Sequence, residues 1–260
     1  MLDPVREQTI ISAINRDGRV GVAVLARELG VSHETIRRDL SVLEGFGRLR
    51  RVHGGAVLYR PDQEQPIVIR SRVKAREKAR IAATARELVT EGMSIFIDTG
   101  STPMAFARTL HDARDLTVHT NSLDIAVILG QARGVRVKTT PGWVRPNDNA
   151  LIGGDTLSFV RRFVYDVAFM GIAACDIKYG WMDYSDDESE LRRILYQQAS
   201  SSVLLADDSK FGRRARIRTF DISTKLTVVT NRALDPEFAK VFADAGVDFL
   251  PGAAPVRTKR

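Results

Sequence analysis

This sequence has one cysteine and no long apolar segment. Cys175 stands alone among 260 residues, which excludes an intrachain disulfide framework and a zinc site built from several cysteines. No stretch reaches the about 18 consecutive apolar residues of a membrane span, and the chain does not begin with the basic and apolar segments of a secretory signal. A single thiol also fits a reducing compartment. We therefore expect a cytoplasmic protein with no membrane partner, no metal site and no cofactor.

Lysine is absent from the first 60 residues, although they hold ten arginines and seven acidic residues. These arginines cluster at Arg37 and Arg38 and at Arg48, Arg50 and Arg51. Arginine can bind phosphate or guanine through two parallel hydrogen bonds, whereas lysine is a point charge. The whole chain has a formal charge of +7 and a pI of about 9.8. The placement of the arginines indicates a nucleic-acid contact; the alternative is a solvated helix face beside a basic loop.

The rest of the composition is that of a globular protein. Apolar residues make up 44% and charged residues 27%, which excludes extensive disorder. A length of 260 residues suits one large domain or two unequal ones, and the patterns favour two. They predict a DNA-binding domain at 1–57, a linker at 58–71, an α/β domain at 72–252 and a basic tail at 253–260.

The first domain has the spacing of a helix-turn-helix with a wing. Helices are predicted over 4–17, 22–29 and 33–43, and a β-hairpin over 47–57. Asp3 and Pro4 are typical of a helix start, Gly30 of a helix end, and Ser32 of a helix cap. A short turn with glycine between two helices is typical of the helix-turn-helix. Alternating apolar and basic residues predict the wing.

From Ser94 onwards, short apolar segments alternate with helical ones. Strands are predicted at 94–98, 116–119, 135–139, 167–171, 203–206 and 226–230. Helices are predicted at 72–91, 103–110, 123–131, 157–163, 187–200 and 236–245. This alternation predicts a mostly parallel sheet covered on both faces, so the fold class is α/β with an N-terminal winged helix-turn-helix. Ligands of such sheets bind beyond the carboxyl ends of the strands.

Polar residues follow several of these strands. Gly100, Ser101 and Thr102 open a helix, where backbone N–H groups and the helix dipole favour an anion; an ordinary helix cap is the alternative. Asn121, after the next strand, can donate to and accept from a hydroxyl group. Lys210 follows a later strand, where its charge can meet a phosphate, although an exposed loop lysine is the commoner outcome. Together these residues predict a site for an anionic, hydroxylated ligand.

Two sets of motifs resemble those of the DeoR family of bacterial transcription regulators. SHETIRRDL at 32–40 and HGGA at 53–56 are similar to the family's DNA-binding signature. DTGST at 98–102, TNS at 120–122 and ADDSKFG at 206–212 are similar to its sensor motifs in order and spacing. The resemblance implies a winged helix-turn-helix, a sensor domain like ribose-5-phosphate isomerase, and two partners: double-stranded operator DNA and a phosphorylated sugar or polyol.

The resemblance and the residue chemistry together predict two sets of site residues. The residues expected to bind DNA are Ser32, His33, Thr35, Arg37, Arg38, Arg48, Arg50, Arg51 and His53. The residues expected to bind the effector are Asp98, Gly100, Ser101, Thr102, Thr120, Asn121, Ser122, Gly142, Gly171, Glu188, Arg192, Asp207 and Lys210. For Arg38 the alternative is an ion pair with Asp39 or Glu34, and for His53 a hydrogen bond within a turn.

The segment GWMDY at 180–184 with Glu188 resembles the glycerol-3-phosphate branch of the family, which makes glycerol 3-phosphate the first candidate effector. Two positions depart from the family pattern. Trp143 stands where a second glycine is usual and is expected to narrow the pocket, and Arg192 stands where lysine is common.

The leading functional prediction is a repressor that binds DNA as a homo-oligomer, a dimer or a tetramer, and releases it when the effector binds. The alternative is a sugar-phosphate isomerase, in which a lysine and carboxylates transfer protons. An isomerase has no use for residues 1–57, so the sequence predicts a regulator without catalytic residues. An architectural DNA-bending protein ranks third, because it leaves the polar loops of the sheet without a role.

Overall fold

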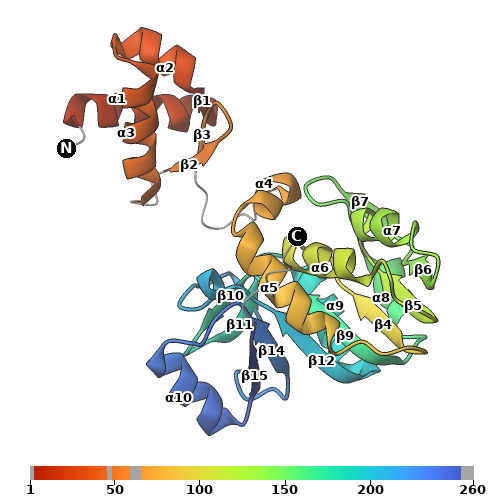
Figure 1. Ribbon diagram of the computed structural model, residues 1–260. Helices are drawn as coiled ribbons and strands as arrows, with labels where there is room; N and C mark the ends of the chain where they lie inside the picture. The colour runs from red at the N-terminus through yellow and green to blue at the C-terminus, as the bar shows by residue number, and fades with distance from the viewer. Residues whose placement is uncertain (1–2, 46–48, 59–65, 253–260) are drawn as a thin grey trace, which may run out of the picture. The chain divides into compact units, whose positions relative to one another are not determined.

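The computed structural model describes residues 3–45, 49–58 and 66–252. They form two compact units, one within Met1–Gln63 and one within Glu64–Arg260 (Figure 1). Arg48, half of the predicted linker (59–65) and the predicted basic tail (253–260) lie outside the described residues.

The smaller unit consists of three helices and a small antiparallel sheet. Its elements are α1 (Pro4–Asp17), β1 (Arg19–Gly21), α2 (Val22–Leu29), α3 (His33–Gly45), β2 (Leu49–Val52) and β3 (Gly55–Leu58). The sheet has the order β1-β3-β2. Buried Ile10, Leu25, Leu40 and Leu49 join the helices and the sheet in one apolar core. The three predicted helices and the predicted hairpin are confirmed.

The turn between α2 and α3 follows from local sequence signals. Gly30 has φ 65°, a left-handed conformation that suits glycine, and it ends α2. Ser32 Oγ accepts a hydrogen bond from Thr35 N at 3.1 Å, so Ser32 caps α3 as predicted. Buried Asp39 of α3 accepts a hydrogen bond from Arg6 Nε of α1 at 2.8 Å. The turn and this ion pair fix the direction of α3 within the unit.

The larger unit is built on a seven-stranded parallel sheet. Its strands are β4 (Ser94–Ile97), β5 (Leu116–Thr120), β6 (Val135–Thr139), β9 (Tyr165–Gly171), β12 (Ala199–Leu205), β14 (Thr227–Thr230) and β15 (Asp248–Pro251). Their spatial order is β15-β14-β12-β9-β4-β5-β6, and each neighbouring pair is parallel. The order therefore reverses between β4 and β9, the place where doubly wound sheets bind ligands.

Helices cover both faces of this sheet, as predicted. They are α4 (Ile67–Arg72), α5 (Ala75–Arg86), α6 (Ser101–Ala107), α7 (Leu123–Leu129), α8 (Gly154–Val160), α9 (Asp186–Gln198) and α10 (Pro236–Ala245), with the short 3₁₀ helices η1 (Arg108–Leu110) and η2 (Asp208–Lys210). Ile81 of α5 and Phe106 of α6 are buried on one face, and Leu195 of α9 and Phe242 of α10 on the other. The burial of each such side chain contributes about 1.5–3 kcal/mol to the stability of the folded state. The two apolar layers thus fix the strand ends and the loops that follow them.

Two small antiparallel sheets complete the larger unit. One is the hairpin of β7 (Trp143–Arg145) and β8 (Ala150–Ile152); the other contains β10 (Ala174–Asp176), β11 (Gly180–Asp183) and β13 (Ile217–Phe220). None of these strands, nor β1 or β15, is predicted from the sequence, because strands of three or four residues contain too little periodicity to detect.

Several predicted segments have different bounds in the structure. α4 begins within the linker predicted at 58–71 and ends at Arg72, and the single helix predicted at 72–91 is shorter, because Lys74 has φ 54° and separates α4 from α5. The helix predicted at 157–163 is α8, which begins and ends three residues earlier. The helix predicted at 187–200 ends early, because Ala199 already pairs with β9 as the first residue of β12. In this last case strand pairing overrides the local helical pattern.

Candidate functional site

A pocket lies at the carboxyl ends of β4, β9 and β12, where the strand order reverses. Its volume is about 20 Å³. Three cationic side chains and one carboxylate line it: Arg70 of α4, Arg192 and Glu188 of α9, and Lys210 of η2. The other lining residues are Thr99, Gly100, Ser101, Thr102, Pro103, Gly171, Ile172 and Leu205.

The loop between β4 and α6 gives the pocket a polar wall. Gly100 has φ 137°, and a Cβ atom there would lie 3.1 Å from Pro103 Cδ, so the position requires glycine. Thr99 N donates to Asp98 Oδ1 at 2.7 Å and to Asn121 Oδ1 at 2.9 Å. Thr99 Oγ1 is buried without a hydrogen-bond partner among the described residues. A buried polar group without a partner lowers the stability of the folded state by about 1–3 kcal/mol, and a hydrogen bond to a polar ligand can offset this loss.

Arg192 is a buried guanidinium group between two buried carboxylates. Its Nε donates to Asp98 Oδ2 at 2.8 Å, and its Nη1 forms an ion pair with Asp183. Burial alone lowers the pKa of Arg192, but the two carboxylates outweigh it and hold that pKa well above its ordinary value. Burial raises the pKa of Asp98 to about 6, despite the opposing effect of Arg192. Arg192 is therefore charged, fixed in place and largely neutralised by its neighbours.

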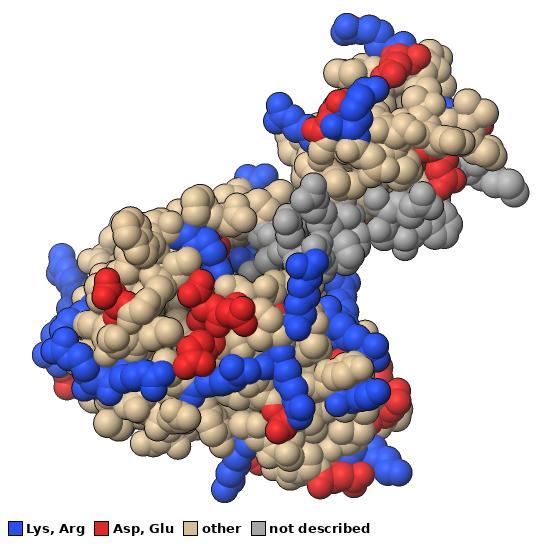
Figure 2. Space-filling model, turned by 180° about the vertical axis from the view of Figure 1, so that it is seen from behind, with Lys and Arg blue, Asp and Glu red and all other residues tan. Residues whose placement is uncertain are grey.

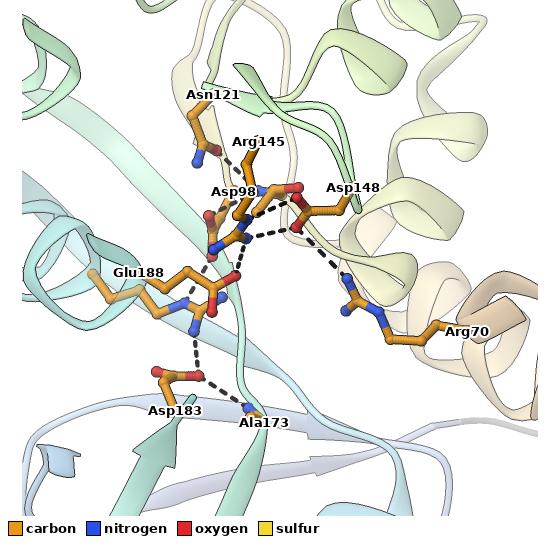
Figure 3. A network of polar contacts seen from close by, with 10 residues as sticks. Arg70, Asp98, Asn121, Arg145, Asp148, Ala173, Asp183 and Glu188 are labelled. Atoms are coloured by element: carbon orange, nitrogen blue, oxygen red, sulfur yellow. Dashed lines mark hydrogen bonds and ion pairs between the residues drawn. The ribbon is translucent and has the colours of Figure 1, made fainter. Parts of the chain in front are cut away.

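Arg145 of β7 joins two further carboxylates (Figure 3). Its guanidinium group donates to both oxygens of Asp148, at 2.9 and 2.6 Å, and to Glu188 Oε1 at 2.6 Å. Arg70 Nη2 lies 3.6 Å from Asp148 Oδ2, the distance of an ion pair rather than a hydrogen bond. Burial raises the pKa of Glu188, but Arg192 and Arg145 outweigh it, so the pKa is lowered. A continuous polar network thus runs from α4 to the wall of the pocket.

The structure brings together one part of the predicted effector site. The predicted residues that line the pocket are Gly100, Ser101, Thr102, Gly171, Glu188, Arg192 and Lys210. Asp98 and Asn121 lie behind the lining and hold Arg192 and the backbone of Thr99. Asp207 Oδ1 accepts a hydrogen bond from Ser209 N at 3.0 Å, which caps the turn that carries Lys210.

Other predicted residues shape neighbouring turns and are not among the lining residues. Thr120 Oγ1 accepts a hydrogen bond from Ser122 N at 3.1 Å, and Ser122 Oγ caps α7. A Cβ atom at Gly142 would lie 2.5 Å from the carbonyl oxygen of Ile152, so this glycine allows the hairpin to close. Trp143 is 80% exposed. The expectation that Trp143 narrows the pocket is therefore wrong.

Four residues of the network, Arg70, Arg145, Asp148 and Asp183, are not predicted from the sequence. One signal for Arg70 exists, because Pro66 precedes an apolar run and proline is common at helix starts. Arg145 and Asp148 pair across three residues of the turn between β7 and β8, which no sequence pattern marks. Asp183 belongs to the GWMDY segment, but the sequence does not indicate its pairing with Arg192.

Of the residues predicted to bind DNA, those that the structure describes lie on α3, at its N-terminal cap or in the wing of the smaller unit. Exposed residues are Ser32, His33, Arg37, Arg38, Arg51 and His53, while Thr35 and Arg50 are half-buried. Glu34 pairs with Arg37 at 3.3 Å and Asp39 pairs with Arg6, so both alternative partners of Arg38 are engaged elsewhere. Arg51 Nη1 donates to Ser41 Oγ of α3 at 2.7 Å, which joins the wing to the helix.

Surface charge elsewhere is mixed. Figure 2 shows Lys and Arg side chains on one face of the larger unit interspersed with Asp and Glu.

Within the described ranges, no group of three or more His, Cys, Asp and Glu side chains is arranged to hold a metal ion. None of the helices there has the length and apolarity needed to cross a bilayer. Burial raises the pKa of the Cys175 thiol, which fits a packed apolar side chain.

Comparisons with known proteins match both units. Residues 6–62 match the family model of the DeoR-like helix-turn-helix domain, and residues 73–232 that of the DeoR C terminal sensor domain. The glycerol-3-phosphate regulon repressor of Haemophilus influenzae is 33% identical over 86% of this chain and 87% of its own length. That of Escherichia coli K12 is 31% identical over 92% of this chain and 95% of its own. Ribose 5-phosphate isomerase A of Methanocaldococcus jannaschii, a solved structure, is 20% identical with a TM-score of 0.38, over 52% of this chain and 53% of its own.

Proposed function

Because this chain belongs to the DeoR family of helix-turn-helix regulators, we propose that it represses transcription and that a phosphorylated sugar or polyol lowers its affinity for operator DNA. Family matches cover both units, and relatives aligned over most of the chain are named repressors. The chain is therefore a transcriptional regulator of the DeoR type, and the isomerase alternative is not favoured.

The effector proposal is carried by the three cationic side chains that meet in the pocket lining. Arg70, Arg192 and Lys210 face a single lining carboxylate, Glu188. Charge-assisted hydrogen bonds from arginine and lysine are the usual means of binding phosphate. Buried Thr99 Oγ1, which has no partner within the described residues, can bind a ligand oxygen beside them. The position at the reversal of strand order supports the same conclusion.

Glycerol 3-phosphate is the first candidate among such compounds. Two relatives are named for the glycerol-3-phosphate regulon. The pocket is small, with a volume of about 20 Å³, which favours a small member of the class over larger sugar phosphates.

The smaller unit is proposed to place α3 in the major groove of the operator. Thr35 and Arg37, near the start of α3, then contact base edges, and Ser32, His33 and Arg38 contact the backbone. The wing contributes Arg48, Arg50, Arg51 and His53. One winged unit covers only a half-site, so we propose a homo-oligomer, a dimer or a tetramer, that acts in the cytoplasm.

A thermal-shift titration of the full chain tests the effector proposal. Glycerol 3-phosphate at about 100 times its Kd is expected to stabilise the folded state by about 2.7 kcal/mol, which raises Tm by about 5–10 °C. Ribose 5-phosphate and fructose 6-phosphate test larger members of the class, and glycerol and inorganic phosphate are the controls. If no phosphorylated compound exceeds inorganic phosphate, the proposed effector class is wrong.

Arg37→Ala tests the proposed reading of bases by α3. We expect a loss of about 1–3 kcal/mol on the preferred operator and a weaker preference for that sequence, because a bidentate base contact is removed. Fluorescence anisotropy with operator and scrambled duplexes measures both. Arg16→Ala, an exposed arginine of α1, is the matched control. Equal weakening on both duplexes would identify Arg37 as a phosphate contact instead.

A further inference from the structure

α4 is the first described helix of the larger unit, and it carries Arg70, one of the charged residues of the pocket. It lies between the two segments that match family models, 6–62 and 73–232. Neither match therefore assigns α4 a role. Along the chain, α4 is the element that leads from the DNA-binding unit into the sensor.

α4 is tied to the β7–β8 hairpin, and the residue that follows it is tied to the turn that carries Lys210. Ile67 N donates to Asn147 O, in the turn between β7 and β8, at 3.0 Å. Lys74, just after α4, donates to Asp208 of η2 at 2.5 Å. Buried Lys78 of α5 donates to two carbonyl groups at the end of α4. A movement of α4 must therefore alter its contacts with the β7–β8 hairpin or with the turn that carries Lys210.

A phosphate that enters this pocket has to compete with carboxylates. Arg70, Arg145 and Arg192 already form ion pairs, and their partners are Asp98, Asp148, Asp183 and Glu188. A phosphate that binds one of these arginines therefore has to share it with a carboxylate or displace that carboxylate.

Of the two arginines that line the pocket, Arg70 has the longer contact with its carboxylate. Arg192 is 4% exposed and donates to Asp98 at 2.8 Å. Arg70 is 14% exposed and lies 3.6 Å from Asp148, a carboxylate that already accepts two short hydrogen bonds from Arg145. Arg70 also belongs to a helix of only six residues, whereas Arg192 lies within the longer α9, packed on the sheet.

We propose that Arg70 binds the phosphate group of the effector and leaves Asp148 as it does so, an inference that rests on the proposed function of the pocket. α4 moves with Arg70, and because the chain runs from α4 to the DNA-binding unit, this movement carries the state of the pocket to that unit. The ligand class is a phosphomonoester of a small polyol or sugar.

The test compares full-length wild type with Arg70→Gln, Arg70→Lys and Arg72→Gln. Arg72 is an exposed arginine of the same helix and is the matched control. Calorimetric titration with glycerol 3-phosphate is expected to show affinity at least about tenfold weaker for Arg70→Gln and within about twofold of wild type for Arg72→Gln. Arg70→Lys keeps the positive charge but lacks the planar guanidinium group, so its affinity for glycerol 3-phosphate is expected to lie between those of Arg70→Gln and wild type. A thermal unfolding transition of Arg70→Gln without ligand that matches that of wild type shows that its loss of affinity is not misfolding.

Operator binding at saturating glycerol 3-phosphate tests the role of α4. Wild type is expected to release the operator, with affinity lowered at least about tenfold, whereas Arg70→Gln retains its affinity within about twofold. If wild type and Arg70→Gln bind glycerol 3-phosphate with equal affinity, the inference about Arg70 is wrong, but the proposed function stands. The same conclusion follows if Arg70→Gln, saturated with glycerol 3-phosphate, releases the operator fully. If wild type binds neither glycerol 3-phosphate nor the other phosphorylated compounds of the thermal-shift panel, the proposed effector site fails, and this inference with it.

Discussion

Replacing Arg192 with methionine is expected to lower the free energy of unfolding of the larger unit by about 3–5 kcal/mol. The change leaves Asp98 and Asp183 buried without their shared cation. A buried carboxylate that loses its partner keeps the desolvation cost without the Coulomb attraction that offset it. Methionine fills most of the volume of the arginine stem, so the loss reflects charge rather than a cavity.

Urea denaturation at pH 7 measures this effect, with Arg161→Met as the control. Arg161 is half exposed, and its ion pair with Glu190 lies at the surface. Loss of this ion pair in Arg161→Met is therefore expected to lower the free energy of unfolding by at most about 1 kcal/mol. Adding Asp98→Asn and Asp183→Asn to Arg192→Met is expected to recover much of the stability. If Arg192→Met alone costs less than about 1 kcal/mol, the buried network does not hold the pocket together.

Lys210→Ala is expected to separate effector sensing from DNA binding. Lys210 lines the pocket from η2, at the carboxyl end of β12. A charge-assisted hydrogen bond to phosphate contributes about 1.5–3 kcal/mol, so affinity for glycerol 3-phosphate should fall by about tenfold to a hundredfold. The DNA-binding residues belong to the other unit, so operator affinity without effector should remain within about twofold. In a cell, this variant would repress even with inducer present.

Operator titrations with and without glycerol 3-phosphate test this prediction on wild type, Lys210→Ala and Lys225→Ala. Lys225 is an exposed loop lysine before β14 and should behave as wild type. If Lys210→Ala releases the operator at the same effector concentration as wild type, Lys210 is an ordinary loop lysine. Loss of operator binding without effector would instead indicate that η2 supports the DNA-binding form.

Elements with strong local signals could be predicted from the sequence. Gly30 and Ser32 mark the two sides of the helix-turn-helix turn, and the structure shows a left-handed cap at one and a capping hydroxyl at the other. Alternating apolar strands and helices predict the parallel sheet, because each pattern reflects which side chains are buried. The carboxyl ends of β4 and β9 then place Gly100 and Gly171 in one pocket.

Residues whose partners lie far along the chain could not be predicted in the same way. Asn121 follows a strand, as the prediction requires, but its side chain accepts a hydrogen bond from Thr99 N and lies behind the pocket lining. Trp143 is next to a glycine of the predicted site, yet it is exposed. The position of a residue in the sequence indicates whether it lies at a strand end or in a turn. It does not indicate the direction in which the side chain points.

The sequence by itself determined the two-domain organisation, the helix-turn-helix with its wing, the α/β class and the family. These properties depend on local periodicity, capping residues and motifs, which are written in consecutive residues. Only the tertiary structure decided that Arg70 reaches the pocket and that Arg192 lies between Asp98 and Asp183. Ion pairs between segments about a hundred residues apart depend on how α4, α9 and the hairpin pack around the sheet, and no local pattern records that packing.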